Sequence, residues 1–98
     1  MNKDFFVYIL ASKKNGTIYV GITSNITKRI WEHKNNIVLG FTSKYSVHKL
    51  VYFETYSSPV TAIAREKYLK GKSRNYKISL IETNNPTWND LDPSSSLT

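Results

Sequence analysis

The side chains of this 98-residue chain that could do chemistry are few: two tyrosines, an arginine four residues before a histidine, and a glutamate. Arg29 and His33 fall in a segment with helical spacing, so both lie on one face of that helix. Glu66 lies four residues after Ala62 and three before Leu69, which puts a carboxylate on the apolar face of a second helix. An unpaired charge there is costly, so we expect a metal ion or a cation, for which Arg29 is a candidate, to face Glu66.

The two tyrosines belong to a predicted β-hairpin over Phe5–Thr23 with an Asn-Gly dipeptide at its tip. Asn-Gly favours a type I′ turn, because both central residues of that turn have positive φ. With a two-residue loop, Tyr8 faces Thr23, and Tyr8, Tyr19 and Gly21 share one face of the hairpin. Gly21 would leave a gap where a ligand could approach the backbone. The alternative is that both tyrosines are ordinary half-buried strand residues, which tyrosine favours.

The composition limits the classes of protein to consider. Fourteen Lys and Arg against seven Asp and Glu give a net charge of +7, which favours a polyanionic partner, nucleic acid foremost. The absence of cysteine excludes disulfides and thiolate metal sites. The apolar runs are shorter than the ~20 residues of a transmembrane helix, and no signal-peptide pattern opens the sequence. We therefore expect a cytoplasmic protein.

The remaining pattern predicts an α+β fold of order ββαβαα, with a small sheet and helices packed on it. We expect one domain over residues 1–91 and a polar, flexible tail over residues 92–98. The predicted elements after the hairpin are a helix from Ser24 or Asn25 to about Asn36, a loop over Val38–Ser46, a strand over Lys49–Tyr56, a helix over Pro59–Lys70 and a helix from Ser73 to between Ile81 and Thr83. The apolar residues expected to pack inward include Ile26, Ile30, Ile37, Ala62, Ile63, Leu69, Ile78, Ile81, Trp88 and Leu91.

Short motifs spread over nearly the whole chain give it a resemblance to a known family. They are Phe6-Val7-Tyr8, Tyr19-Val20-Gly21, Arg29-x-x-x-His33, Arg65-Glu66-Lys67 and the closing stretch Asn85–Leu91. In this order and spacing they resemble the GIY-YIG nuclease superfamily, and in particular its small stand-alone bacterial members.

The resemblance implies a three-stranded antiparallel sheet flanked by three helices, with one active site that hydrolyses phosphodiester bonds using a single divalent metal ion. Tyr8 and Tyr19 would line this site, and Arg29 would contact the scissile phosphate. His33 matches an auxiliary base or hydrogen-bond donor. Glu66 would be the ligand of the metal, Mg²⁺ or Mn²⁺.

The transfer from the family is less direct at three points. Asn85 matches an asparagine that relatives carry late in the domain, and Asn75 or Asn84 could serve instead. The glycine of the first triplet is replaced by phenylalanine. Isoleucine and threonine follow the second triplet, where some members have a lysine that helps to activate the base. The general base therefore stays open between Tyr19, His33 and metal-bound water.

Basic residues around the predicted site would bind phosphates without reading sequence. For each of them, an ordinary solvated side chain is the alternative. Trp31 and Trp88 could stack bases or anchor the core. The candidate nucleic-acid-binding residues are Gly21, Lys44, Tyr45, Arg65, Lys67, Lys70, Lys72 and Arg74.

We interpret the chain as a metal-dependent endonuclease that cuts structured or damaged DNA in repair or recombination, with RNA as the alternative substrate. A nucleic-acid-binding module of the same fold with little turnover is the alternative. A protein-interaction domain would predict no salt-dependent nucleic-acid binding at all. A homodimer would let one small site act on both strands, so a dimer is one assembly that we consider.

Overall fold

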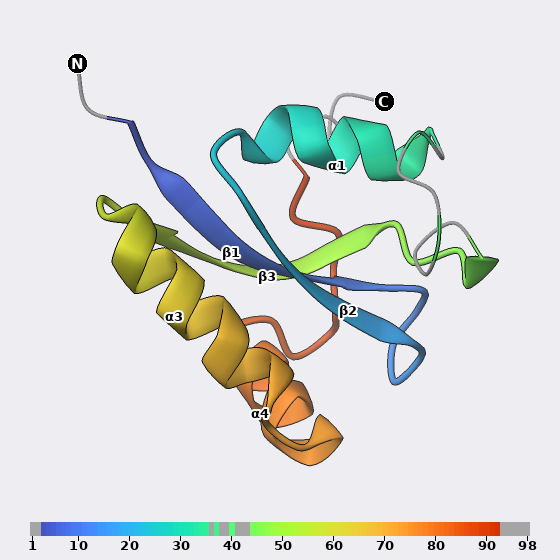
Figure 1. The fold of residues 1–98 in the computed structure, drawn as a ribbon. Coiled ribbons are helices and arrows are strands. Elements are labelled where there is room, and N and C mark those ends of the chain that lie inside the picture. Colours follow the sequence, from blue (N-terminus) through green and yellow to red (C-terminus); the bar gives the residue numbers. More distant parts are fainter. Residues whose placement is uncertain (1–2, 36, 38–39, 41–43, 93–98) are drawn as a thin grey trace.

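The computed structural model describes residues 3–35, 37, 40 and 44–92 (Figure 1). The predicted helix end at Asn36, most of the predicted loop over Val38–Ser46 and the tail after Asp92 lie outside the described residues. The elements are β1 (Phe5–Ala11), β2 (Ile18–Thr23), α1 (Ile26–Lys34), β3 (Lys49–Tyr56), α3 (Pro59–Lys70) and α4 (Arg74–Asn84).

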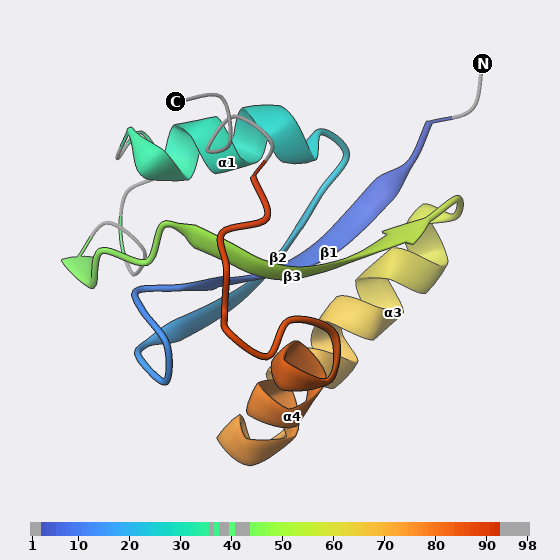
Figure 2. The same cartoon turned by 180° about the vertical axis from the view of Figure 1, so that it is seen from behind.

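The three strands form one antiparallel sheet in the order β2-β1-β3, so β1 is central and the other two strands are edges. Helix α1 covers one face of the sheet, and α3 and α4 cover the other (Figure 1 and Figure 2). The predicted α+β class and its element order are confirmed. None of the helices in the described part of the chain is long and apolar enough to cross a lipid bilayer.

The hairpin register differs from the predicted one by two residues. Tyr8 pairs with Gly21 and not with Thr23. The connection is a longer loop, closed by hydrogen bonds from Ser12 N to Thr17 O (3.0 Å) and from Gly16 N to Lys13 O (2.9 Å). The predicted type I′ turn is wrong, because that turn needs positive φ at both central residues. Asn15 has φ 60°, but Gly16 is not in the positive-φ region.

Two hydrogen bonds from Arg74 explain the longer loop. The size of the register shift explains why each side chain keeps its predicted face of the sheet. Arg74 Nη2 donates to the carbonyl oxygens of Asn15 (2.8 Å) and Gly16 (2.6 Å), so a side chain far along the sequence holds the tip. Because side chains alternate with a period of two, a shift of two residues leaves every side chain on its predicted face. Tyr8 and Tyr19 therefore still share one face of the sheet.

The helices begin where the sequence predicts them to begin. Asn25, Ser58 and Ser73 each accept a hydrogen bond from the backbone N–H three residues later, as N-cap residues do. Strand β3 and helix α3 have their predicted bounds. Helix α1 ends at Lys34, shortly before the predicted end, and Asn35 caps its carboxyl terminus.

Three residues that we expected to face inward are exposed instead: Ile37 (54%), Ile63 (45%) and Leu91 (38%). Ile37 lies beyond the end of α1, so the helical spacing that placed it on the apolar stripe no longer applies. Ile63 lies on the flank of α3 away from the buried Ala62 and Leu69.

The sheet separates two clusters of buried side chains. On the side of α3 and α4, apolar residues of all three strands pack with Ala62, Leu69, Ile81 and Trp88. On the side of α1, the cluster is smaller and contains Tyr8 together with aliphatic residues, with Tyr19 packed against it. The larger apolar core thus lies under α3 and α4, and the smaller cluster on the α1 side includes Tyr8 and Tyr19.

The segment after α4 crosses the edge strand β3 and continues toward α1 (Figure 2). Leu91 N donates to Leu50 O (2.7 Å), and Leu50 N donates to Asp90 Oδ1 (3.3 Å). These bonds occupy backbone groups that an edge strand would otherwise expose. Asp92, which we expected to open the tail, is only 6% exposed because its carboxylate binds Lys34 Nζ at 2.9 Å.

Candidate active site

A buried hydrogen bond between a tyrosine and a histidine lies at the centre of the candidate site. The Tyr8 hydroxyl and His33 Nε2 are 3.0 Å apart, and both residues are at most 2% exposed. Gly21 lies opposite Tyr8 in the sheet, and a Cβ atom there would collide with the Tyr8 phenol. The space over Gly21 is therefore filled by the Tyr8 ring, and the predicted gap for a ligand is wrong.

Tyr19 completes a group of three rings. Its centroid is 6.4 Å from that of Tyr8 and 5.8 Å from that of His33, and the Tyr8 and His33 centroids are 5.9 Å apart. Tyr19 lies on the edge strand β2, where it pairs with Leu10 of β1. Tyr19 is therefore half-buried, whereas Tyr8 on the central strand is fully buried. Of the two tyrosines, Tyr19 is the one that a substrate can reach.

Arg29 lies one helical turn before His33 and brings a positive charge to this group. Its side chain is 41% exposed, and its contact with Glu32 is loose, at 3.5 Å between Nε and Oε1. Arg29 and His33 were predicted to share one face of this helix. The His33 imidazole lies in the core, and the Arg29 guanidinium lies at the edge of the core. An exposed guanidinium beside buried rings is suited to bind an anionic group that arrives from solvent.

Burial sets the protonation of the central pair. It lowers the pKa of His33 to about 4, with the nearby charges of Arg29 and His48 acting in the same direction. Burial also raises the pKa of Tyr8, and the positive charge of Arg29 only partly offsets this rise. At neutral pH, His33 is therefore an uncharged imidazole and Tyr8 keeps its phenolic proton.

Glu66 reaches the same region from α3. Its side chain is 14% exposed, and its carboxylate forms an ion pair with Lys70 Nζ, one turn later, at 2.9 Å. Lys70 Nζ also lies 5.8 Å from the centre of the Tyr19 ring, and the charge of Glu66 acts on Tyr8. The cation that we expected to face Glu66 is thus Lys70 and not Arg29, and the i,i+4 spacing is the sequence signal that could have identified it.

The donor set of this region fits only a metal ion that needs few protein ligands. Among the described residues, no group of three or more His, Cys, Asp or Glu side chains is placed to hold a metal. Glu66 offers one largely buried carboxylate that already attracts a cation. A single carboxylate suits Mg²⁺, which retains most of its waters and takes further oxygens from a phosphate.

Asn85 does not join this group. Its Nδ2 donates to Val51 O (3.0 Å) and Asn89 O (2.8 Å), and its Oδ1 accepts from Asn89 N (3.1 Å). These bonds tie the end of α4 to β3, the edge of the sheet away from β2. The two alternative asparagines are exposed on α4, and Asn84 bonds a carbonyl of its own helix. Asn85 has a structural role in this fold.

Several of the predicted nucleic-acid contacts are engaged inside the protein. Arg65 forms a bidentate pair with Glu54, and Arg74 holds the hairpin tip. Lys72 lies over the exposed Tyr68 and Tyr76 rings, at 4.6 and 5.4 Å from their centroids. Lys67 is exposed, and Lys44 lies 5.4 Å over the exposed Tyr45 ring.

The two tryptophans behave differently. Trp88 is fully buried and anchors the core, with its Nε1 bonded to Glu82 at 2.8 Å. Trp31 is 56% exposed on α1, so it is not a core residue.

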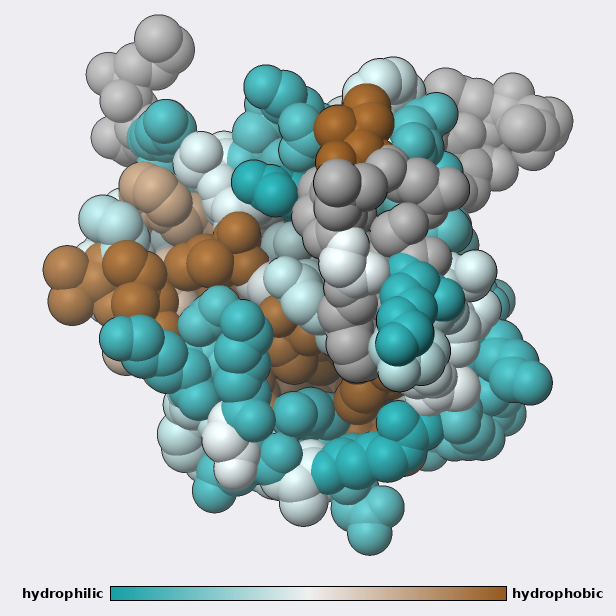
Figure 3. All heavy atoms as spheres, turned by 45° about the vertical axis from the view of Figure 1, so that its right-hand side comes forward, coloured by the Kyte–Doolittle hydropathy of each residue, from teal (hydrophilic) through white to brown (hydrophobic). Residues whose placement is uncertain are grey.

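Hydrophilic residues cover much of the face drawn in Figure 3, with hydrophobic surface gathered mainly toward one side of it.

Comparisons with known proteins indicate the family of this chain. Residues 4–79 match the family described as the GIY-YIG catalytic domain. A UPF0213 protein of Clostridium perfringens is 40% identical over 78 residues, which are 80% of this chain and 83% of that protein. A UPF0213 protein of Bacillus licheniformis is 33% identical over 95% of this chain and 94% of its own length.

A solved structure shows the same arrangement of elements. The solution NMR structure of a UPF0213 protein from Bacillus halodurans matches with a TM-score of 0.56 and 25% identity, covering 97% of both chains. The family match covers the strands, α1, α3 and the first part of α4, which include every residue gathered around Tyr8. The chain belongs to the GIY-YIG catalytic domain family, and its relatives are small UPF0213 proteins.

Proposed function

We propose that this protein is a metal-dependent endonuclease that hydrolyses phosphodiester bonds in structured or damaged DNA. The observation that carries the proposal is the convergence of side chains from four elements beside the edge strand β2. They supply a guanidinium, a neutral imidazole, two phenols and a carboxylate, which are the groups that such a hydrolysis uses. The converging residues are Tyr8, Tyr19, Arg29, His33 and Glu66.

Arg29 binds the scissile phosphate in this proposal. Its guanidinium presents a planar set of donors that matches phosphate oxygens. A positive charge held there stabilises the negative charge that develops as the bond breaks. The exposure of the side chain and its loose contact with Glu32 support this role, because little has to be broken before a phosphate binds.

The rings of the site handle the attacking water. Tyr19, half-buried at the rim, positions the water, and the Tyr8 hydroxyl fixes the orientation of the His33 ring. The lowered pKa of His33 keeps its imidazole neutral at pH 7 and also makes it a weaker base than an ordinary histidine. The proton of the water can go to Tyr19, to His33 or to a base that the hydrated metal ion supplies.

Glu66 is the residue that would hold the divalent ion. When bound, such an ion acts as a Lewis acid on the phosphate oxygens, which lowers the barrier by several kcal/mol. The Lys70 ammonium now paired with Glu66 marks this carboxylate as a place where a positive charge is stable.

A second candidate function rests on that same ion pair. If Lys70 keeps Glu66 occupied, the site binds nucleic acid without cutting it. The lack of a lysine directly after the second triplet favours this reading too. Both functions predict salt-dependent binding of nucleic acid, and only the nuclease predicts metal-dependent products.

The test is cleavage of labelled single-stranded, duplex, flap and branched DNA, and of matched RNA, with Mg²⁺, with Mn²⁺ and with chelator. We expect the wild type to cut with metal and Glu66→Gln to lose at least about 100-fold in rate, since the metal accounts for several kcal/mol. Tyr19→Phe, which keeps the ring and removes the hydroxyl, tests one proton acceptor: full activity would remove Tyr19 from that step and leave His33 or the hydrated metal ion.

The outcomes separate the candidates. Binding of DNA by the wild type without cleavage under any metal condition would favour the binding module. Unchanged cutting by Glu66→Gln would remove Glu66 from the site and contradict the proposed metal ligand. Cleavage that persists in chelator at full rate would contradict a metal-dependent enzyme.

A further inference from the structure

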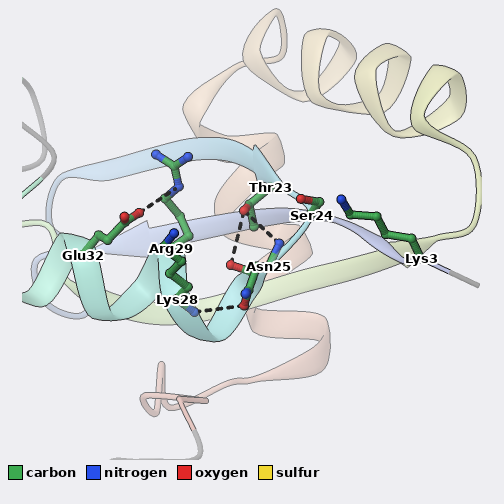
Figure 4. Close-up of a pocket in the computed structure, with 7 residues that line it drawn as sticks. All are labelled: Lys3, Thr23, Ser24, Asn25, Lys28, Arg29 and Glu32. Atoms are coloured by element: carbon green, nitrogen blue, oxygen red, sulfur yellow. Dashed lines mark hydrogen bonds and ion pairs between the residues drawn. The ribbon is translucent and has the colours of Figure 1, made fainter.

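One pocket of the described structure lies beside the candidate active site. A pocket of about 370 Å³ opens where β2 passes into α1, lined by side chains from three segments of the chain (Figure 4). One segment precedes β1, one is the short connection between β2 and α1, and one is the start of α1. The lining residues are Lys3, Thr23, Ser24, Asn25, Lys28, Arg29 and Glu32.

The pocket is positively charged. It holds three cationic side chains, Lys3, Lys28 and Arg29, and one carboxylate, Glu32, which is in loose contact with Arg29. Within the described part of the chain, neither lysine ammonium has a carboxylate partner. Both lysines are exposed, so an anion that enters the pocket meets charges that no internal ion pair has neutralised.

The wall that carries these charges is held by its own hydrogen bonds. Thr23 Oγ1 donates to Asn25 O (3.2 Å) and accepts from Asn25 N (3.1 Å). Asn25 Oδ1 accepts from Lys28 N (3.1 Å), so the connection and the first turn of α1 form one unit. The backbone that bears Lys28 and Arg29 is therefore held by the protein's own hydrogen bonds.

The pocket and the candidate active site share two residues. Arg29 and Glu32 line the pocket, and their charges also act on the buried Tyr8 and His33. A phosphate bound by Arg29 thus sits at the boundary between the two. The lysines lie on the pocket side of that boundary, away from the rings, where they can meet the next part of the same polyanion.

We propose that this pocket binds a backbone phosphate of the nucleic-acid strand, next to the phosphate that Arg29 contacts. The assignment rests on the proposed function, because it takes the strand to run through the Arg29 site. Lysine ammonium groups are point charges that suit phosphate oxygens, and contacts of this kind fix the register of the strand without reading its sequence. The pocket would then determine which phosphate along the strand reaches Tyr19 and Glu66.

Binding measured without catalysis tests this assignment. The affinity of labelled single-stranded and duplex DNA is measured by fluorescence anisotropy in chelator, from low to moderate salt, for the wild type, Lys3→Gln and Lys28→Gln. Each pocket variant should bind several-fold more weakly, and the slope of log affinity against log salt should fall by about 0.7 to 0.9 per lysine. Lys13→Gln removes the same charge at the opposite end of the hairpin and is the matched control.

Amide NMR shifts identify the source of the anion. A short oligonucleotide should shift the backbone signals of residues 23–29 in the wild type and less so in Lys28→Gln, and inorganic phosphate should shift them only at far higher concentration. Saturation by inorganic phosphate, with DNA affinity unchanged in both pocket variants, would overturn the strand assignment. Equal losses in Lys13→Gln and Lys28→Gln would overturn it as well, because the charge effect would then be general.

The outcomes for the pocket and for the nuclease are distinguishable. Metal-dependent cutting by the wild type, together with unchanged affinity and salt slope in Lys3→Gln and Lys28→Gln, would overturn the pocket and leave the nuclease standing. Absence of DNA and RNA binding by the wild type at every salt concentration would overturn both.

Discussion

Two neighbouring residues of α3 illustrate how one helix serves both the fold and the candidate site. Arg65 points toward β3 and pairs with Glu54, and Glu66 pairs with Lys70 beside Tyr19 on β2. Strands β3 and β2 are the opposite edges of the sheet. The same helix thus carries one carboxylate–cation pair at each edge, and the two pairs differ in how completely the carboxylate is bonded.

The Glu54 carboxylate is fully occupied. Arg65 donates to both of its oxygens, with Nε–Oε1 and Nη2–Oε2 distances of 2.9 Å, and the Tyr52 and Tyr56 hydroxyls donate to one oxygen each. Burial alone would raise the pKa of Glu54, but the hydrogen bonds from Arg65 and the two tyrosines outweigh it and lower that pKa. A carboxylate held this tightly stabilises the fold and has no free position for a ligand.

The ion pair between Glu66 and Lys70 is much weaker. Lys70 is 48% exposed and pairs at the i,i+4 spacing of one helix, a contact worth about 0.3–0.5 kcal/mol. Another cation can replace it at little cost. The difference between the pairs indicates which carboxylate is available for chemistry, and substitution of each should give opposite results for stability and activity.

The largest expected contrast is in stability. Glu54→Gln removes the charge that compensates Arg65, whose side chain is only 25% exposed, so we expect the free energy of unfolding to fall by roughly 3 kcal/mol. Urea denaturation of the wild type and variant at pH 7 measures this loss. Glu66→Gln is the matched control, and we expect it to change the unfolding free energy by no more than about 0.5 kcal/mol.

Equal losses of stability in the two glutamine variants would contradict the comparison, because Glu66 would then also be a structural carboxylate. A loss of cleavage in Glu54→Gln, at a temperature where that variant is folded, would also contradict the comparison, because Glu54 would then take part in the reaction. The expected pattern is one destabilised and active variant, and one stable and inactive variant.

A second contrast appears on acidification, in the buried pair between Tyr8 and His33. The pKa of His33 is lowered from its ordinary 6.5 to about 4, so the unfolded chain takes up a proton there before the native protein does. The stability from this group is complete above pH 6.5 and falls as the pH drops toward 4, by about 2 kcal/mol at pH 5. Urea denaturation at pH 7 and pH 5 measures the fall.

His33→Gln should remove most of this pH dependence, because glutamine does not titrate. His48→Gln replaces the other histidine of the chain and should keep most of the pH dependence, because burial is the main cause of the lowered pKa of His33. The comparison at pH 5 avoids the range in which Glu54, with its lowered pKa, would take up a proton. A wild-type stability that stays constant from pH 7 to pH 5 would show that His33 is not held neutral by burial.

The parts of the fold that local chemistry determines could be predicted from the sequence. Ser58 and Ser73 cap helices through bonds to backbone groups three residues away, so their signals are complete within one turn. The alternation of side chains put Tyr8 and Tyr19 on one face even though the register was wrong, because the error was an even number of residues.

The missed features depend on residues that are far apart in the sequence. The Asn-Gly tip is held by Arg74, and no local preference of the hairpin predicts that contact. The engagement of Arg65 likewise depends on a strand residue, Glu54, so Arg65 looked like a free cation in the sequence. The placement of Asn85 at the β3 edge follows from the path of the chain after α4, which has no periodic signal.

The smallest expected effect bears directly on the Glu66–Lys70 pair. A metal ion that binds Glu66 must displace the Lys70 ammonium, so Lys70→Gln should strengthen metal binding. The pair is worth about 0.3–0.5 kcal/mol, which corresponds to roughly a twofold gain, and loss of the nearby positive charge adds to it. Mn²⁺ titration followed by electron paramagnetic resonance measures this affinity without substrate, and Lys67→Gln removes an exposed charge of the same helix as the control. Weaker Mn²⁺ binding in Lys70→Gln would mean that Lys70 orients the carboxylate for the metal and does not compete with it.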